Sequence, residues 1–189
     1  MRALLTILIS TVTAFGVAAA DEPRSRPSVS ETPYARMQAL NPLIGKWELT
    51  MEMSDDRGAS WRAFPKSTVD VAYRLNDLAL SEMAVRGDDA GFDVEFHIGF
   101  DQYRDVYRLM ALDSIYGVPD VYEGTIVNGE LVVTNLKAGT TFPLGNGVSR
   151  AFRLSLELKP DARIMLIEGS DDGGETWFPA FRNTYVAIR

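Results

Sequence analysis

Few side chains in this sequence have the type and spacing that catalysis or metal binding requires. The 189 residues include one histidine and no cysteine, and no G-x-S-x-G, Walker or H-E-x-x-H motif is present. The histidine, His97, alternates with Asp93 and Glu95, so the three side chains would lie on one face of a strand. There His97 could act as a base, as a metal ligand or as a haem ligand. The other face, from Phe92 to Phe100, is more apolar. We therefore expect the His97 row to face solvent, and we predict no catalytic residue, metal site or cofactor.

Two pairs of adjacent carboxylates are the other candidates for metal or acid-base chemistry. Asp88-Asp89 and Asp171-Asp172 could belong to a calcium site or a glycosidase pair. Neighbouring residues on a strand point to opposite faces, and the spacing does not fit an EF-hand loop. We interpret both pairs as solvated turns, in which Asp accepts hydrogen bonds from nearby amides.

Arg108 is the cation best placed to contact a bound molecule. It lies in an apolar strand pattern, and if its row faces the interior of the fold, the guanidinium can pair with a ligand carboxylate beside Met110. If that row faces outward, Tyr107 and Leu109 line the interior instead. Both orientations stay open at this level. The candidate ligand-binding residues are Arg108, Met110, Tyr107, Tyr122 and Phe96.

Alternating apolar and polar residues predict strands from Lys46 to the C-terminus. In the first of them, Trp47, Leu49 and Met51 alternate with polar neighbours, a period of two that gives one buried face. Roughly ten such segments follow one another at the short, even spacing of a β-barrel or sandwich. They lie near 46–53, 69–75, 78–86, 92–100, 105–112, 120–127, 130–136, 152–158, 163–169 and 177–188. A short helix is expected before them, from Thr32 to Leu40.

A short motif occurs twice, near each end of this strand series. Residues 54–61 (SDDRGASW) and 170–177 (SDDGGETW) both fit S-x-D-x-G-x-[ST]-W. The motif resembles the Asp-box, a non-catalytic hairpin found in sialidase propellers and in unrelated β folds. A propeller needs at least four blades of four strands, so the chain is too short for one. The resemblance implies two braced hairpins in which Asp56, Trp61, Asp172 and Trp177 have structural roles.

The start of the first strand resembles that of lipocalins and fatty-acid-binding proteins. Gly45-Lys46-Trp47 follows the short helix as the G-x-W motif of those families, and the closing W-x-x-x-x-R-x-x-Y from Trp177 to Tyr185 resembles bacterial lipocalin-like proteins that follow a signal peptide. The resemblance implies an all-β, single antiparallel up-and-down barrel in which Trp47 plugs one end. It also implies an arginine over that tryptophan, either Arg182 or Arg189. Haem-binding relatives carry a histidine near the C-terminus, and none is present here.

The N-terminus predicts an exported protein. Arg2, an apolar run from Ala3 to Gly16 and the small residues Ala18-Ala19-Ala20 form a signal-peptide pattern too short for a comfortable membrane span. We expect a signal peptide at 1–20, a disordered lead at 21–31 and a barrel domain at 32–189, in the periplasm or secreted. An uncleaved anchor is the alternative. After removal of Arg2 with the signal peptide, the chain would have 18 basic and 26 acidic residues, a formal charge of −8. This negative charge disfavours binding to nucleic acid and to anionic membranes.

In an up-and-down barrel, alternate hairpin loops share a rim. The two motif loops would then be neighbours on one rim, since the last strand pairs with the first. The longer loops would lie on the same rim, and the tight turns would lie on the opposite rim. The sequence thus predicts one open mouth and one closed floor. Two functions fit: a carrier of a small apolar or amphipathic molecule in the lumen, or an interaction or oligomerisation module whose barrel is filled by side chains. An enzyme is a third, weaker hypothesis, and the oligomeric state is not predicted.

Overall fold

A short helix, α1 (Glu31–Gln38), and a 3-10 turn, η1 (Asn41–Leu43), precede an almost wholly β structure. The computed structural model describes residues 31–85 and 93–189. The predicted signal peptide, the predicted lead up to residue 30 and the predicted Asp88-Asp89 turn lie outside these ranges. Within them no helix is both long and apolar enough to cross a bilayer. The strands are β1 (Gly45–Met53), β2 (Arg62–Ala63), β3 (Ser67–Arg74), β4 (Ala79–Ala84), β5 (Val94–Asp101), β6 (Val106–Asp113), β7 (Asp120–Val127), β8 (Glu130–Thr134), β9 (Phe142–Gly145), β10 (Val148–Glu157), β11 (Ala162–Ser170) and β12 (Phe178–Ala187).

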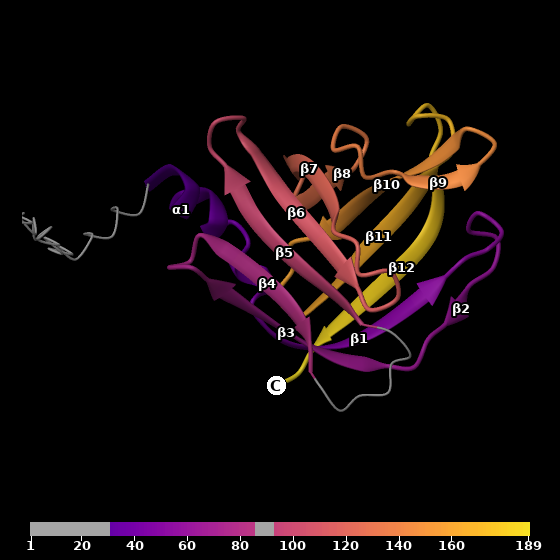
Figure 1. Cartoon of the computed structure of the whole chain (residues 1–189). Coiled ribbons are helices and arrows are strands. Elements are labelled where there is room, and N and C mark those ends of the chain that lie inside the picture. The colour runs from indigo at the N-terminus through magenta and orange to yellow at the C-terminus, as the bar shows by residue number, and fades with distance from the viewer. Residues whose placement is uncertain (1–30, 86–92) are drawn as a thin grey trace, which may run out of the picture.

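Ten of these strands close into an antiparallel barrel (Figure 1). Each strand pairs with its neighbour in the order β1-β3-β4-β5-β6-β7-β8-β10-β11-β12, and β12 returns to β1 over seven residue pairs, from Trp47 opposite Ala187 to Met53 opposite Phe181. The predicted lipocalin-like barrel and its first-to-last strand pairing are therefore confirmed. The short strands β2 and β9 extend the hairpins of β1 and β10 beyond the closed wall.

The helix end of the barrel is the closed floor. Figure 1 shows α1 at this end, with the β1–β2 and β11–β12 loops at the other. Met37, Leu40 and Leu43 from α1 and η1 are at most 1% exposed and join the core. The Tyr107 hydroxyl donates to the carbonyl of Arg36 at 2.7 Å, and so fastens the helix to the barrel wall. Burial of these apolar side chains closes the floor without help from a ligand.

Trp47 plugs the floor as expected, but the arginine that covers it is Arg163. The Trp47 indole donates to the Leu43 carbonyl at 2.9 Å, and the Arg163 guanidinium lies 3.8 Å from its ring centroid. Arg163 is 1% exposed and also lies 4.5 Å from the Tyr185 ring centroid. The guanidinium is thus held between two aromatic rings, an arrangement that offsets part of the cost of burying a cation.

The expectation that Arg182 or Arg189 covers Trp47 is wrong, because neither side chain points into the barrel. Inward positions of β12 are odd-numbered, as the burial of Asn183 and Tyr185 shows, so Arg182 faces outward. There it donates to Glu52 at 2.7 Å and stacks 4.6 Å from the Trp61 ring centroid. Arg189 lies beyond the end of β12 and pairs at 3.0 Å with Asp161, with 85% of its side chain exposed.

A buried carboxylate, Glu82, balances the charge of Arg163. The Arg163 Nη2 lies 3.8 Å from Glu82 Oε2, and the Tyr185 hydroxyl donates to Glu82 Oε1 at 2.9 Å. Glu82 is only 4% exposed. Burial raises the pKa of Glu82 to about 7, although Arg163 and the hydrogen bond from Tyr185 both act to lower it. Desolvation therefore dominates at this carboxyl group.

We predict that Arg163→Met destabilises the protein by about 3–5 kcal/mol at pH 8, because it leaves Glu82 buried without its counter-charge and removes the cover of Trp47. Urea unfolding followed by tryptophan fluorescence measures the loss. Arg189→Ala is the control and should change stability by no more than about 0.5 kcal/mol, since its ion pair is exposed. A loss below about 1 kcal/mol for Arg163→Met would contradict the assignment.

Glu82 should also make stability depend on pH. Its pKa is higher in the folded protein, about 7, than the ordinary value of 4.5, so the folded state binds this proton more tightly than the unfolded chain does. The free energy of unfolding therefore falls as pH rises from about 4.5 to about 7, by at most about 3 kcal/mol. Glu82→Gln should remove this fall. Urea unfolding of the wild type and the variant at pH 5, 6, 7 and 8 measures this dependence. If the free energy of unfolding changes equally with pH in the two proteins, the assignment to Glu82 is refuted.

Candidate functional site

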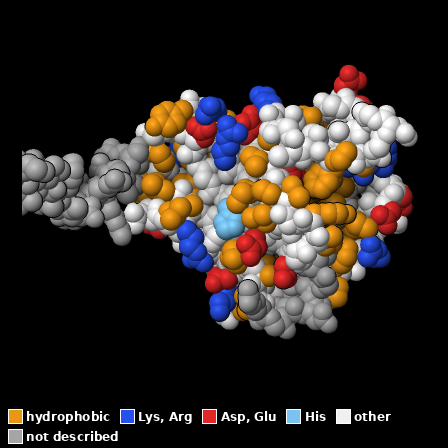
Figure 2. All heavy atoms as spheres, viewed as in Figure 1, with side chains coloured by type: hydrophobic (Ala, Val, Ile, Leu, Met, Phe, Trp, Pro, Cys, Tyr) orange, Lys and Arg blue, Asp and Glu red, His pale blue; other side chains and the backbone are white. Residues whose placement is uncertain are grey.

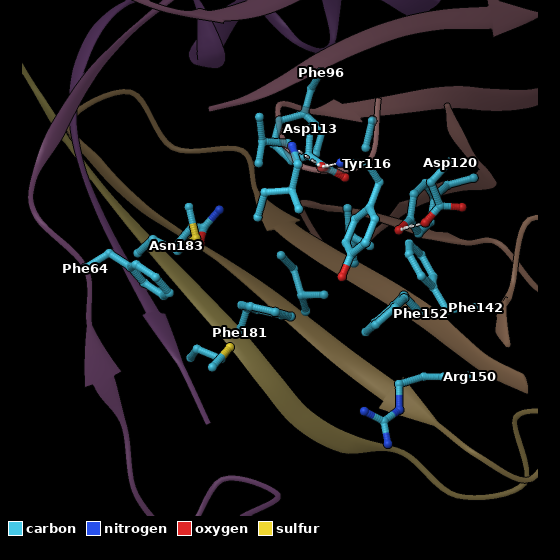
Figure 3. Close-up of a pocket in the computed structure, with 18 of the residues that line it drawn as sticks. Phe64, Phe96, Asp113, Tyr116, Asp120, Phe142, Arg150, Phe152, Phe181 and Asn183 are labelled. Atoms are coloured by element: carbon cyan, nitrogen blue, oxygen red, sulfur yellow. Dashed lines mark hydrogen bonds between the residues drawn. The ribbon is translucent and has the colours of Figure 1, made fainter. Parts of the chain in front are cut away.

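A cavity of about 520 Å³ occupies the half of the barrel nearest the mouth. This volume lies within the range of small-molecule sites, about 300–1,000 Å³. Most of its wall is aromatic or aliphatic, with two methionines (Figure 3). The lining residues are Met51, Met53, Arg62, Phe64, Val94, Phe96, Ala111, Asp113, Ile115, Tyr116, Asp120, Tyr122, Phe142, Leu144, Arg150, Phe152, Leu154, Ile167, Phe181 and Asn183.

Strand alternation brings these side chains together from distant parts of the chain. Phe96 on β5 lies opposite Ala111 on β6, and both face inward. Leu154 on β10 lies opposite Ile167 on β11 and faces the same space. Because successive residues of a strand point to opposite faces, every second residue near the mouth contributes to the wall. Deeper in the barrel the same inward positions hold buried side chains that pack against one another and fill the interior.

The rim of the cavity exposes apolar side chains. Ile115 and Tyr116 in the β6–β7 loop are 62% and 70% exposed, and Leu144 on β9 is 49% exposed. Tyr116, Phe142 and Phe152 form an edge-to-face series with ring centroids 6.5 and 5.5 Å apart that runs from the rim into the wall. Figure 2 shows apolar side chains gathered toward this end of the face in view. Apolar surface thus leads continuously from solvent into the cavity.

The carboxylates of the wall are occupied by partners within the protein. Asp113 accepts the backbone N–H groups of Ile115 and Tyr116 at 2.8 and 2.7 Å, which shapes the rim loop. Asp120, 7% exposed, accepts from the Tyr122 hydroxyl, from Asn135 at 3.1 Å and from the Thr140 hydroxyl at 2.6 Å. Burial and the nearby Asp120 raise the pKa of Tyr122 well above its usual value. Both carboxylates therefore have structural partners within the protein.

Arg150 is likewise neutralised. It forms a two-bond ion pair with Asp171, with Nε–Oδ1 at 2.7 Å and Nη2–Oδ2 at 3.0 Å. Arg57, in the first motif loop, reaches the same Asp171 at 3.4 Å. Both guanidinium groups lie over the Phe178 ring, at 5.1 and 4.5 Å from its centroid. The two motif loops are therefore in contact, as the barrel topology predicted.

Each motif loop uses its own aspartate as an internal brace. Asp56 accepts from the Ser60 hydroxyl at 2.6 Å, the Ser60 amide at 2.8 Å and the Ser54 hydroxyl at 2.8 Å, and these bonds lower its pKa to about 2. Asp172 makes the equivalent bonds to Ser170 and Thr176, which also lower its pKa. The tryptophan of each loop stacks on an outward arginine: Trp61 on Arg182, and Trp177 on Arg153 at 4.5 Å.

The five candidate ligand-binding residues lie in three different places. Phe96 and Tyr122 line the cavity. Tyr107 faces inward but at the floor, with its hydroxyl on the α1 carbonyl. Arg108 lies on the outer surface, where it pairs with Glu123 at 2.7 Å and Asp101 at 3.3 Å. Met110 shares that outer row, so the orientation in which Tyr107 and Leu109 line the interior is the observed one.

His97 also lies on the outer surface, as expected. Its side chain is 38% exposed and its Nε2 is 3.6 Å from Glu95. In the described part of the chain no group of three or more His, Cys, Asp or Glu residues could hold a metal ion. The chemical character of the cavity is therefore set by aromatic surface and a few hydrogen-bonding groups.

Sequence reasoning missed several wall residues. Phe181 and Asn183 follow the inward parity of Tyr185, so the alternation in the last strand could have identified them. Phe142 and Leu144 belong to the short β9, where alternation is too brief to indicate a face. Arg150 was not singled out from the sequence, because its ion pair with Asp171 depends on a contact between different hairpins.

Comparisons with known proteins inform the fold and leave the function open. No protein-family profile and no curated protein matches the sequence. Among solved structures, the chain is similar to Rv2717c from M. tuberculosis, with a TM-score of 0.57 and 15% identity over 82% of this chain and 98% of that one. It is also similar to the S-type phycobiliprotein lyase CPES from Guillardia theta, with a TM-score of 0.45 and 14% identity over 80% and 92% of the two chains. The first similarity supports the lipocalin-like barrel fold.

Proposed function

We propose that this protein binds a small apolar or amphipathic molecule inside its barrel and carries it. The observation on which this depends is the cavity of about 520 Å³ with an aromatic wall and an apolar rim. At about 30 Å³ per water, it has room for about 17 water-sized groups, the size of a small lipid or a two- to three-ring compound. Its wall offers mostly apolar surface to a ligand.

The alternative, an interaction module with a filled barrel, fits the interior less well. Leu109, Leu131 and Met165 fill the floor half of the barrel and are each 1% exposed. The same strands leave the mouth half hollow, although larger side chains at Ala111 or Val94 would reduce the void. Unfilled volume forfeits packing energy, so a hollow confined to one end favours a binding role.

Export is part of the proposal and is supported by the signal-peptide pattern of residues 1–20. A periplasmic or secreted carrier can use a fold without disulfides, because a domain of this length buries enough surface to be stable without them. The resemblance of the two motif loops to Asp-boxes supports a bracing role for them at the mouth, since their aspartates bond within the loops. These loops would hold the rim in shape around a ligand.

We predict that Ala111→Trp abolishes binding of the neutral fluorescent probe N-phenyl-1-naphthylamine, because the indole occupies the cavity. A titration followed by probe fluorescence should show at least a tenfold loss of affinity. Met110→Trp is the matched control: it adds an indole at the next residue, on the outer face, and should leave probe affinity within about twofold.

Native mass spectrometry of the exported protein, purified from its own compartment, provides an independent test. A carrier should retain a bound mass or acquire one from a lipid mixture, and Ala111→Trp should do neither. Equal probe binding by the two tryptophan variants, or no binding by the folded wild type, would overturn the proposal.

A further inference from the structure

One side of the cavity mouth is built from residues without charge. The β6–β7 loop, residues 114–119, and the segment 138–149, which contains β9, include no Asp, Glu, Lys, Arg or His residue, although 24% of the chain is charged. The two segments meet where the Tyr116 and Phe142 ring centroids lie 6.5 Å apart (Figure 3). Together they form the uncharged rim.

The uncharged rim exposes large apolar side chains to solvent. Val118 is 62% exposed and Val148 is 40% exposed, and they extend the apolar surface that Ile115, Tyr116 and Leu144 present at the mouth. The last three also line the cavity. An apolar patch bordered by polar residues marks a contact with a protein, a membrane or a ligand. This rim therefore fits a partner that offers apolar surface.

Hydrogen bonds within the protein hold the β6–β7 loop in place. The N–H groups of residues 115–117 all donate to Asp113, two to its carboxylate at 2.8 and 2.7 Å and one to its backbone carbonyl at 3.0 Å. Ser114 makes two further bonds of 2.9 Å with Asp93. A backbone N–H group without a partner is costly in an apolar medium. These N–H groups already have partners, so the loop can enter such a medium without losing their hydrogen bonds.

The charges that border the uncharged rim do not favour an anionic partner. Asp113 and Asp120 stand at the two ends of the β6–β7 loop. The cations beside the segment 138–149 are Lys137, whose Nζ lies 3.9 Å from Glu123, and Arg150, whose ion pair is described above. Both cations therefore already face a carboxylate of the protein.

The motif loops add negative charge to the same end of the barrel. Residues 54–61 and 170–177 contain five acidic residues and one arginine, a net charge of −4, and the whole chain carries −7. Arg62 on β2 adds one positive charge to the cavity wall, which does not offset this surplus. Electrostatics thus disfavour an anionic surface at the mouth, and apolar contact is the attraction that remains.

The uncharged rim is too small for a stable protein interface. A standard interface uses about 20–30 residues on each partner, whereas the five side chains named above are the large apolar ones that this rim exposes. A bilayer needs less, because a few apolar side chains and a tyrosine at the level of the headgroups are enough for reversible binding. The size of the patch therefore favours a membrane over a second protein.

We propose that the uncharged rim docks reversibly on a zwitterionic lipid bilayer, with the mouth of the cavity toward the membrane. The purpose of this contact rests on the proposed carrier function, since an apolar ligand would use it to pass between bilayer and cavity. Ile115, Tyr116 and Leu144 belong both to the rim and to the cavity wall. A ligand that follows them stays in contact with apolar surface for the whole passage.

Flotation with vesicles tests the docking surface directly. The exported protein should float with an excess of phosphatidylcholine vesicles, equally at low and at high salt. Val118→Asp brings a charge to the bilayer and should lower the vesicle partition coefficient at least fivefold. Val127→Asp is the matched control: it makes the same change at a side chain that is 49% exposed, beside the β7–β8 turn at the floor end. Its partition coefficient should stay within twofold of the wild type.

Two further measurements separate a zwitterionic bilayer from other partners. Replacement of half of the phosphatidylcholine by phosphatidylglycerol should weaken binding because the mouth is acidic, and stronger binding that salt abolishes would refute the proposal. Sedimentation velocity tests a second copy of the chain as the partner. A dimer that Val118→Asp dissociates, without any vesicle binding, would refute the membrane contact. Equal loss of vesicle binding in the two valine variants would refute the assignment to this rim.

Probe binding in buffer without vesicles keeps failure of the docking surface apart from failure of the carrier function. Neither Val118 nor Val127 lines the cavity, so both variants should bind N-phenyl-1-naphthylamine within twofold of the wild type, which also shows that they are folded. If the wild type binds the probe but does not float with vesicles, only the docking surface is refuted. If it floats but binds neither the probe nor a lipid, the carrier function is refuted and the membrane contact stands.

Discussion

Pairing of β12 with β1 is the interaction on which the rest of this structure depends. It removes the last two open edges of a curled antiparallel sheet, so that every central strand has partners on both sides. The same closure brings the two motif loops into contact through Arg57 and Asp171, although 114 residues separate them. It also places Tyr185 beside Leu49 and near Arg163. The floor plug, the braced rim and the cavity between them all require the closed ring.

The barrel interior is divided into a filled half and a hollow half. Helix α1 and Trp47 close the floor, and apolar side chains fill the space above them. A layer of polar groups follows, with Glu82 and Tyr185 on the floor side and Asn183 on the cavity side. Buried polar groups of this kind lower stability relative to an apolar core.

The charges of the cavity wall are largely balanced within the protein. Asp120 is satisfied by neutral donors, and Arg150 is paired with Asp171. The acidic surplus of the chain thus has little influence on the inside of the barrel. A mostly apolar wall whose buried charges are paired is more favourable for a neutral molecule than for an ion.

Local pattern in the sequence determined most of the strands, the tight turns and, in some strands, which face points outward. His97 was placed outside because its neighbours alternate with it, and the two aspartate-braced loops follow from eight-residue motifs that form their own hydrogen bonds. These features depend on backbone geometry within one strand or hairpin. Contacts across the barrel depend on register and curvature instead. For that reason only the tertiary structure decided that Arg163, rather than Arg182 or Arg189, covers Trp47, that Arg108 faces outward, and that Asn183 lies between a packed floor and an open cavity.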